Sequence, residues 1–361
     1  MEDKIRRKYN KKGRALLFAS LFVLLISVLG LYYFIFAPTW PVFNFLPAKE
    51  LSPIISSQTS TAALVANDCP DCQPRWLDGI LVPVNEVNAF PVAVVIDNDV
   101  LARPQAGLAR ASLVYEAPVE GGMTRYLAIF PADIDLEVIG PVRSARPYFV
   151  VWAEELRALF VHCGGSPEAL ARLKADTVYD LNEFYNNAYF WREESDTRSA
   201  PHNVLISGNN WRAYLEKRNL GEKKADVWLF KEESDHASSS PDISVRFSAN
   251  FQSLWRYDAE NNEYRRFFNG VVSSDEVAEI RAKNVIIHYS ESKILDKTGR
   301  LSLNLNGQGP AKICLDGVCQ SGYWRKIGQE RTRYYYENNE EVKLNPGITW
   351  IEVANSTTRV D

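Results

Sequence analysis

Apolar stretches alternate with amphipathic, helix-like stretches between residues 79 and 220. Three segments predict helices, each opened by a serine suited to the N-cap position: 144–158, 166–174 and 207–218. Four runs rich in β-branched and aromatic residues predict strands: PVAVVI (91–96), SLVYEA (112–117), RYLAIF (125–130) and LFVHC (159–163). The first and last of these strands are nearly continuous in apolar character, as in sheets that are buried on both faces. Residues 79–220 therefore predict a layered α/β domain.

The pattern changes at residue 243, where short β-rich runs begin to follow one another at close spacing. Turn signals separate these runs, among them Asn269-Gly270, Asn306-Gly307 and Asp316-Gly317. We predict that residues 243–361 form an antiparallel β-rich domain, either a sandwich or a partly closed barrel. The polar stretch 221–242 is expected to be the hinge between the two domains.

The N-terminus differs from both predicted domains. Residues 15–37 carry no charge and would span about 34 Å as a helix, enough for a bilayer core of about 30 Å. This run is longer than the apolar core of a secretory signal and lacks a clear cleavage site. We predict a single transmembrane signal anchor with residues 1–14 in the cytoplasm and the main body outside it, in a bacterial cell membrane. The proline-rich segment 38–78 is the expected linker.

Charge is distributed unevenly between these parts. The formal net charge of −4 combines seven basic and two acidic residues in segment 1–14 with 34 basic and 43 acidic residues elsewhere. An acidic exported body argues against nucleic acid as a partner, which would require a basic face. Locally clustered arginines on such a body favour a focused anion site.

Five cysteines agree with export. Cys314 and Cys319 flank the hairpin signal Asp316-Gly317 and would face each other across two strands, which predicts a disulfide. Cys69 and Cys72 predict a second, local disulfide. The alternative is one zinc site built from all four thiolates. We assign no metal site.

The stretch IGPVRSARP (139–147) is the most informative for chemistry. A predicted strand, LEVI (136–139), leads into the first turn of a helix, where Pro147 fits. Arg143 and Arg146 would share a face there and oppose the positive end of the helix macrodipole. Either carboxylates or a bound anion should offset them, and phosphate suits both a helix N-terminus and a guanidinium fork.

A second stretch runs from a strand end through a glycine pair into a helix start. His162 closes the strand, Gly164 and Gly165 allow a ligand to approach backbone N–H groups, and Ser166 is the expected N-cap. The alternative interpretation is a simple strand-to-helix turn with His162 as a satisfied core residue.

Acidic and basic side chains complete the candidate set. They follow predicted strands or precede helices, and could serve a phosphoryl site or structural ion pairs equally well: Asp97, Glu116, Glu120, Arg125, Arg198, His202 and Asn203. We assign no cofactor, although Asp97, Glu116 or Glu120 could hold a divalent cation or act as a base. A Cys163 nucleophile would need a distant partner such as His202, because adjacent strand residues point to opposite faces. Ser166 lacks the Gly-x-Ser-x-Gly elbow.

These stretches resemble the YerB-like lipoproteins of bacteria, a family defined by a domain of unknown function. The resemblance covers about residues 79–361 and rests on nine strings: PVAVVIDN (91–98), ARPQAGL (102–108), VYEAPVEGGMTRYLAIF (114–130), IGPVRSARPYFV (139–150), FVHCGGSPEAL (160–170), APHNV (200–204), WRYDAENNEYRR (255–266), KNVII (283–287) and KLNPGITWIEV (343–353). It implies a membrane-attached, envelope-facing protein with an α/β part and a distinct C-terminal part. This chain departs from lipoprotein members in having a signal anchor in place of a lipobox.

Two functions are expected from this. The first is a module that binds, and could act on, an anionic phosphate-bearing envelope ligand, with Arg125, Arg143 and Arg146 as its clamp. The second is a non-catalytic interaction or scaffold protein that docks an envelope partner through aromatic residues of the β-rich domain, such as Trp255, Trp324 and residues 334–336. Packing within the sheets is the alternative role for these aromatics. Whether the protein is an enzyme is left open.

Overall fold

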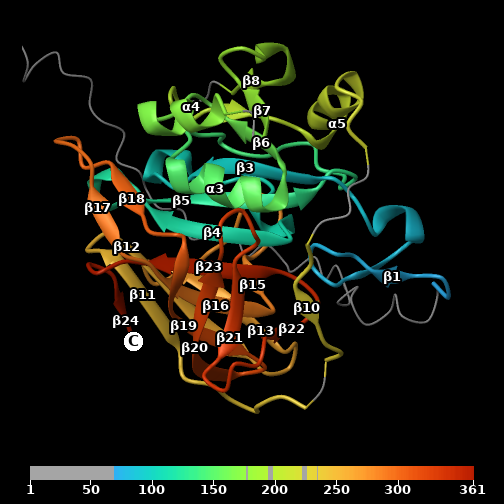
Figure 1. The fold of residues 1–361 in the computed structure, drawn as a ribbon, viewed down its shortest axis with the longest axis vertical. Helices are drawn as coiled ribbons and strands as arrows, with labels where there is room; N and C mark the ends of the chain where they lie inside the picture. Colours follow the sequence, from blue (N-terminus) through green and yellow to red (C-terminus); the bar gives the residue numbers. More distant parts are fainter. Residues whose placement is uncertain (1–68, 176–177, 194–197, 222–225, 234) are drawn as a thin grey trace, which may run out of the picture. The chain divides into compact units, whose positions relative to one another are not determined.

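The computed structural model describes five segments of the chain: 69–175, 178–193, 198–221, 226–233 and 235–361 (Figure 1). The predicted tail 1–14, the predicted anchor 15–37 and the linker up to residue 68 lie outside these segments. Among the helices of the described segments, none is both long and apolar enough to cross a membrane.

A ten-stranded sheet forms the centre of the described structure. In spatial order its strands are β21 (Arg333–Tyr336), β20 (Val318–Lys326), β19 (Gly307–Leu315), β16 (Asn284–Tyr289), β23 (Thr349–Ala354), β4 (Leu113–Pro118), β5 (Thr124–Pro131), β3 (Pro91–Asp97), β6 (Leu159–His162) and β7 (Tyr179–Asn182). The strands β16, β23, β4, β3, β6 and β7 all run in one direction, because β5 is antiparallel to both of its neighbours. Their carboxyl ends therefore lie along one edge, which we call the carboxyl edge.

A second sheet of six strands is antiparallel throughout. Its strands are β14 (Val271–Val272), β13 (Glu263–Phe268), β12 (Phe251–Asp258), β11 (Ile243–Ser248), β24 (Arg359–Val360) and β15 (Arg281–Ala282). Four two-stranded pairs complete the β structure: β1 (Gln73–Pro74) with β2 (Leu81–Val82), β8 (Trp191–Arg192) with β9 (Val204–Leu205), β10 (Leu229–Phe230) with β22 (Lys343–Leu344), and β17 (Ser292–Ile294) with β18 (Leu301–Leu303).

Within the described segments, three α-helices accompany the sheets: α3 (Pro147–Leu156), α4 (Pro167–Leu173) and α5 (Gly208–Lys217). Pro147 occupies the first turn of α3, where its missing N–H leaves no hydrogen bond unmade. Ser166 and Ser207 cap α4 and α5 by accepting hydrogen bonds from backbone N–H groups of the first turn. Short 3-10 turns follow two central strands: η3 (Val100–Ala102) follows β3, and η5 (Glu120–Gly122) follows β4.

The ten-stranded sheet is covered on both faces, which explains why β3 is buried along its whole length. Val94 and Ile96 of β3 belong to the core shared with Trp255 of the six-stranded sheet. Ala93 and Val95 point the other way, into the core shared with α3 and α4. Figure 1 shows this layering, with α3 and the β11–β13 sheet on different sides of the central strands.

The coarse fold prediction is confirmed: a mixed α/β sheet is followed by an antiparallel β-rich sheet. The predicted strands 91–96, 112–117, 125–130 and 159–163 correspond to β3, β4, β5 and β6, and the three predicted helices contain α3, α4 and α5. The predicted strand LEVI is wrong. Only Ile139 of this run forms a bridge, to Ile206.

The C-terminal part also contributes to the α/β sheet, which local sequence patterns did not indicate. Strands β16, β19, β20, β21 and β23 all belong to the ten-stranded sheet, and β23 pairs in parallel with β4. In this pairing Glu352 lies beside Glu116. The β-rich part of the chain is thus divided between the ten-stranded sheet, the six-stranded sheet and two smaller pairs.

Candidate functional site

Several predicted site residues gather at the carboxyl edge of the ten-stranded sheet. Asp97 ends β3, Glu120 follows β4, and Gly164 follows β6, all strands of one direction. Arg125 joins them from β5, where it is the cross-strand partner of Asp97. Ligands of open α/β sheets commonly bind outside the carboxyl ends of the strands, so a binding site is expected at this edge.

Asp97 is the central carboxylate of this group. One of its oxygens lies 2.8 Å from Nε of Arg143 and 2.7 Å from Nδ1 of His202. Asp97 is buried, whereas the side chain of Arg143 is 19% exposed, so the pair reaches from the interior to the surface. His202 comes from the segment before β9, a hundred residues further along the chain.

Arg146 is held by a second carboxylate. Its Nε and Nη2 donate to the two oxygens of Glu120, at 2.7 Å each, which is a bidentate pair. Although partial burial alone would raise it, the Arg146 guanidinium lowers the pKa of the Glu120 carboxyl below its usual value. Carboxylates therefore offset the two arginines at the start of α3, as one of the two sequence interpretations expected.

Arg125 differs from its two neighbours. It is only 6% exposed, and its Nη1 donates to the backbone oxygen of Ser144 at 3.0 Å. Among the described residues it forms no ion pair with a carboxylate. Its buried Nε makes no hydrogen bond, and neither does the Nε of Arg143, although that atom lies 2.8 Å from Asp97. Burial and the nearby charges of Arg146 and Arg143 lower the pKa of Arg125 to about 10, although the Asp97 carboxylate acts in the opposite direction. It remains cationic at neutral pH and lacks a counter-ion of its own.

These side chains form what we call the arginine cluster: Arg125, Arg143, Arg146, Asp97, Glu120 and His202. Three guanidinium groups face two carboxylates. One positive charge is therefore left over among the described residues, close to the N-terminus of α3, where the helix macrodipole also favours an anion.

Gly164 and Gly165 form a turn between β6 and α4, which we call the glycine turn. It contacts the segment that carries the arginines but is not part of the arginine cluster. Nδ1 of His162 lies 2.6 Å from the carbonyl oxygen of Gly164, and its Nε2 lies 2.8 Å from an oxygen of Asp180. The N–H of Gly164 donates to Asn182, so this predicted donor is already used. Gly165 forms a bridge with Ala145 in the segment that carries the arginines.

His162 is thus a satisfied core residue, as the alternative interpretation expected. Ser166 acts as the N-cap of α4. The hydrogen bond from Ala145 N–H to the carbonyl of Gly164 ties the turn to the arginine segment. The turn therefore positions that segment and offers few donors to a ligand.

Glu116 lies on the other face of the sheet and does not join the arginine cluster. It is fully buried, 2.6 Å from Nη2 of Arg266, and accepts a hydrogen bond from Thr124. The second buried carboxyl, Glu352, accepts from Nε1 of Trp255 at 2.7 Å. We call Arg266, Glu116, Glu352 and Trp255 the Arg266 network. Sequence reasoning missed Arg266 and Glu352 because their partners are distant in the chain.

The remaining predicted residues take part in separate contacts. Arg198 lies near Glu193 and Glu276 and donates to the backbone oxygen of Pro104. Asn203 is buried and accepts from Arg192 at 3.1 Å. Both residues tie the segment before β9 to its surroundings.

Both predicted disulfides are present. Cys314 bonds to Cys319 across the turn at Asp316-Gly317, and Cys69 bonds to Cys72. The zinc alternative is therefore wrong for this structure, because disulfide sulfurs are not thiolate ligands. Among the described residues, no group of three or more His, Cys, Asp or Glu side chains is placed to hold a metal ion.

Cys163 is a buried free thiol whose Sγ lies 3.4 Å from a carboxylate oxygen of Glu183. Burial and this carboxylate raise the pKa of Cys163 to about 11. A thiol in this state is a poor nucleophile at neutral pH.

The aromatic residues proposed for docking lie mostly inside the molecule. Trp255, Trp324 and Tyr334 are buried, and Tyr335 and Tyr336 are half-buried. Packing within the sheets, the other interpretation of the same residues, describes them better.

Comparisons with known proteins match both parts of the chain. Residues 77–221 match the family model described as "Protein of unknown function (DUF3048) N-terminal domain", and residues 243–351 match the model of its C-terminal domain. "Putative lipoprotein YerB" of Bacillus subtilis (strain 168) is 30% identical over 286 residues, which cover 77% of this chain and 85% of that protein. The crystal structure of YerB from Bacillus subtilis is similar with a TM-score of 0.71 and 29% identity, over 79% of this chain and 98% of that one.

Proposed function

Because the chain belongs to the DUF3048 family, we propose that it is a membrane-attached, extracytoplasmic protein that binds an anionic, phosphate-bearing ligand of the cell envelope at the arginine cluster. The cluster is a binding site in this proposal, and no reaction is assigned to it.

The proposed location rests on two observations. The Bacillus subtilis relative is named a lipoprotein, which places a related protein at a membrane. This chain begins with a basic segment followed by the uncharged run 15–37, the pattern of a signal anchor with its body exported. In this proposal the two proteins hold similar extracytoplasmic domains at the membrane by different anchors, a lipid in the relative and a transmembrane helix in this chain.

The observation that carries the proposed ligand is the unmatched charge of Arg125. Arg143 and Arg146 each have a carboxylate within 2.8 Å, whereas Arg125 is buried beside them without one among the described residues. A buried cation without a partner costs free energy, and an anion at this place would offset that cost. Phosphate groups suit it because guanidinium groups donate two parallel hydrogen bonds to their oxygens.

The surface position of Arg143 gives such an anion a way to approach. Its side chain is partly exposed, while Asp97 and Arg125 behind it are buried. An oxyanion that contacts Arg143 first would come within the field of all three arginines. A multivalent phosphate should bind better than a single negative charge, because the surplus charge is concentrated in one small region.

The test uses the full-length protein in detergent with sodium pyrophosphate as the probe. We expect pyrophosphate to raise the thermal unfolding midpoint above that seen with sodium chloride at equal ionic strength. Arg125→Gln should abolish this rise, and Arg125→Lys, which keeps the charge but loses the fork, should keep part of it.

The matched control is Arg246→Gln, an exposed arginine on β11 of the other sheet, which should respond to pyrophosphate as the wild type does. Equal responses of the wild type and Arg125→Gln would contradict the proposed site. Unfolding of both Arg125 variants without ligand would be detected by their melting curves, and Arg143→Gln would then take their place.

A further inference from the structure

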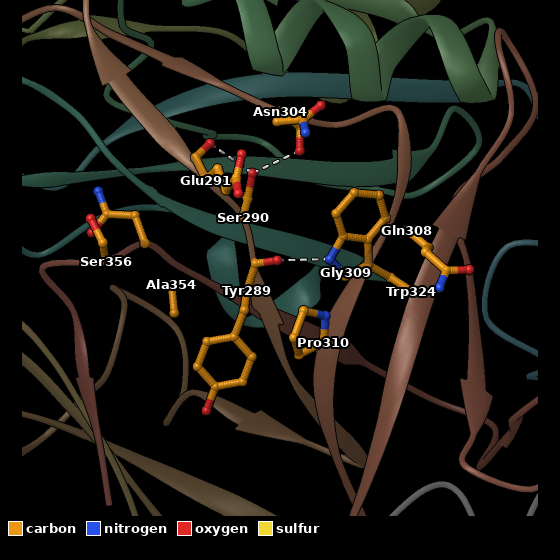
Figure 2. Close-up of a pocket in the computed structure, with 11 residues that line it drawn as sticks. Tyr289, Ser290, Glu291, Asn304, Gln308, Gly309, Pro310, Trp324, Ala354 and Ser356 are labelled. Carbon is orange, nitrogen blue, oxygen red and sulfur yellow. Dashed lines mark hydrogen bonds between the residues drawn. The ribbon is translucent and has the colours of Figure 1, made fainter.

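A cavity of about 350 Å³ opens at another part of the carboxyl edge, between the ends of β16 and β23 (Figure 2). Eleven residues line it: Tyr289, Ser290, Glu291, Asn304, Gln308, Gly309, Pro310, Trp324, Ala354, Asn355 and Ser356. None of these residues belongs to the arginine cluster. The cavity is therefore a separate candidate site on the same sheet.

The strand topology explains why the sheet opens here. β16 pairs with β19 as far as His288 and Ala311, whereas β19 continues along β20 to the pair of Gly307 with Lys326. Pro310, next in line opposite β16, has no N–H with which to extend the pairing. Beyond β16 the chain enters the β17–β18 hairpin, and beyond β23 it crosses to β24 in the other sheet. Adjacent parallel strands whose chains leave in different directions create a crevice at their carboxyl ends.

One wall of the cavity is fixed in place. Figure 2 shows Nε1 of Trp324 donating to the backbone oxygen of Tyr289, at 2.7 Å. The indole also stacks on the ring of His288, with centroids 4.6 Å apart. A Cβ atom at Gly309 would lie 2.7 Å from Trp324 Nε1, so glycine is required for the indole to lie here. Trp324 is itself buried, so it holds this wall in place, and the partly exposed Tyr289 is the aromatic side chain that a ligand could contact.

The lining differs in charge from the arginine cluster. Among its eleven described residues none is lysine or arginine, and the single ionisable carboxylate is Glu291. The polar groups are mainly amides and hydroxyls, those of Asn304, Gln308, Asn355 and Ser356. Such a lining gives an anion no cationic partner, and Glu291 would repel it. It offers hydrogen-bond donors and acceptors together with apolar surface from Tyr289, Pro310 and Ala354.

We propose that this cavity binds an uncharged saccharide unit. A sugar ring presents hydroxyl groups at its edge and C–H groups on its faces, which match a rim of amides and hydroxyls around an aromatic and proline wall. The volume is at the lower end of the range for small-molecule sites, about 300–1,000 Å³, which fits one or two sugar rings. The inference is independent of the anion site proposed above.

The experiment titrates full-length protein with two neutral disaccharides, N,N′-diacetylchitobiose and maltose, by isothermal titration calorimetry. The detergent must not be a glycoside, and lauryldimethylamine oxide meets this need. We expect at least one of the two sugars to bind. Gln308→Ala should weaken that binding about fivefold, the usual effect of losing one hydrogen bond.

Gln320→Ala is the matched control, because Gln320 is an equally exposed glutamine on the neighbouring strand β20 and lies outside the cavity. It should leave sugar binding unchanged, and so should Arg125→Gln. Absence of binding by both disaccharides would overturn the proposal, as would equal weakening by Gln308→Ala and Gln320→Ala. Binding of an uncharged tetra-alanine peptide in place of the sugars would also overturn it.

Discussion

The arginine cluster and the Arg266 network use the same residue types on opposite faces of one sheet, yet they differ in access and in charge balance. Arg266 is 1% exposed and contacts a fully buried Glu116, while the rings of Tyr126 and Trp350 lie within 6 Å of its guanidinium. The arginine cluster reaches the surface through Arg143. An arginine beside a carboxylate can therefore be assigned to a ligand site or to a structural pair only when its access to solvent and its charge balance are both known.

The charges of the Arg266 network balance internally. Burial raises the pKa of Glu352 well above its usual range, and the carboxylate of Glu116 raises it further, although Arg266 acts in the opposite direction. This shift favours the protonated form of Glu352, in which one cation of the network faces one anion. In the arginine cluster three cations face two anions, and the surplus makes it the better candidate for a ligand.

The largest expected effect is on stability. Arg266→Ala should destabilise the protein by about 3–5 kcal/mol, because Glu116 would remain charged and buried without its partner. Chemical denaturation of the full-length protein in detergent measures this. The double variant Arg266→Met with Glu116→Gln should recover much of the loss, since it removes both charges together. If Arg266→Ala were as stable as the wild type, water would have access to Glu116 and the network would not be buried in solution.

The second-largest expected effect is on pyrophosphate binding at the arginine cluster, on the opposite face of the sheet from the Arg266 network. Arg125→Gln should weaken pyrophosphate binding by about tenfold or more, as expected for the loss of one charge-assisted hydrogen bond. It should lower stability far less than Arg266→Ala does, because it leaves Asp97 and Glu120 with their own arginines. Calorimetric titration and denaturation of the same sample measure both quantities. A large loss of stability in Arg125→Gln with unchanged pyrophosphate binding would mean that Arg125 is a structural residue and that the arginine cluster is not the ligand site.

The third effect is a pH dependence that belongs to the Arg266 network. Because its pKa is raised in the folded protein, Glu352 retains its proton to higher pH there than in the unfolded chain, whose glutamic acid pKa is about 4.3. Its contribution to stability is therefore complete below that pH and is lost as the pH rises toward the folded-state pKa. Glu352→Gln, which resembles the protonated form, should flatten the decline of stability from pH 5 to pH 9. Identical pH profiles for both proteins would mean that Glu352 is ionised in the folded state.

The smallest effect concerns Glu120. Because its pKa is lowered, its contribution is present above the ordinary glutamic acid pKa and is lost on acidification, the opposite sign to Glu352. Glu120→Gln should release Arg146 from its bidentate pair and tighten pyrophosphate binding about two- to fivefold. Titration at neutral pH tests this, with Arg246→Gln again as the control. Weaker binding in Glu120→Gln would mean that this carboxylate orients Arg146 for the ligand.

Features set by a few neighbouring residues could be predicted from the sequence. The disulfide of Cys314 and Cys319 follows from a two-residue turn, and both of its central residues, Asp316 and Gly317, have the positive φ that such a turn requires. The starts of α4 and α5 follow from serine caps. For Arg143 and Arg146 the sequence left two possibilities open, carboxylates or a bound anion, and the structure pairs them with Asp97 and Glu120.

Features that depend on distant pairing could not be predicted. The parallel register of β23 with β4 joins residues more than two hundred positions apart, and it places Glu352 beside Glu116. No local pattern distinguishes Glu116, which faces the buried network, from Glu120, which faces the cluster four residues later. Glu116 lies within β4, whereas Glu120 lies beyond the strand in η5, where it reaches Arg146.

The most direct measurement of the central claim is a crystal structure of the protein grown with tungstate, an oxyanion that resembles phosphate and scatters X-rays anomalously. The account predicts an anomalous peak beside the guanidinium of Arg125, within contact of Arg143 or Arg146, and loss of that peak in Arg125→Gln. Tungstate bound only at other surface lysines and arginines, with the wild-type cluster empty, would contradict it.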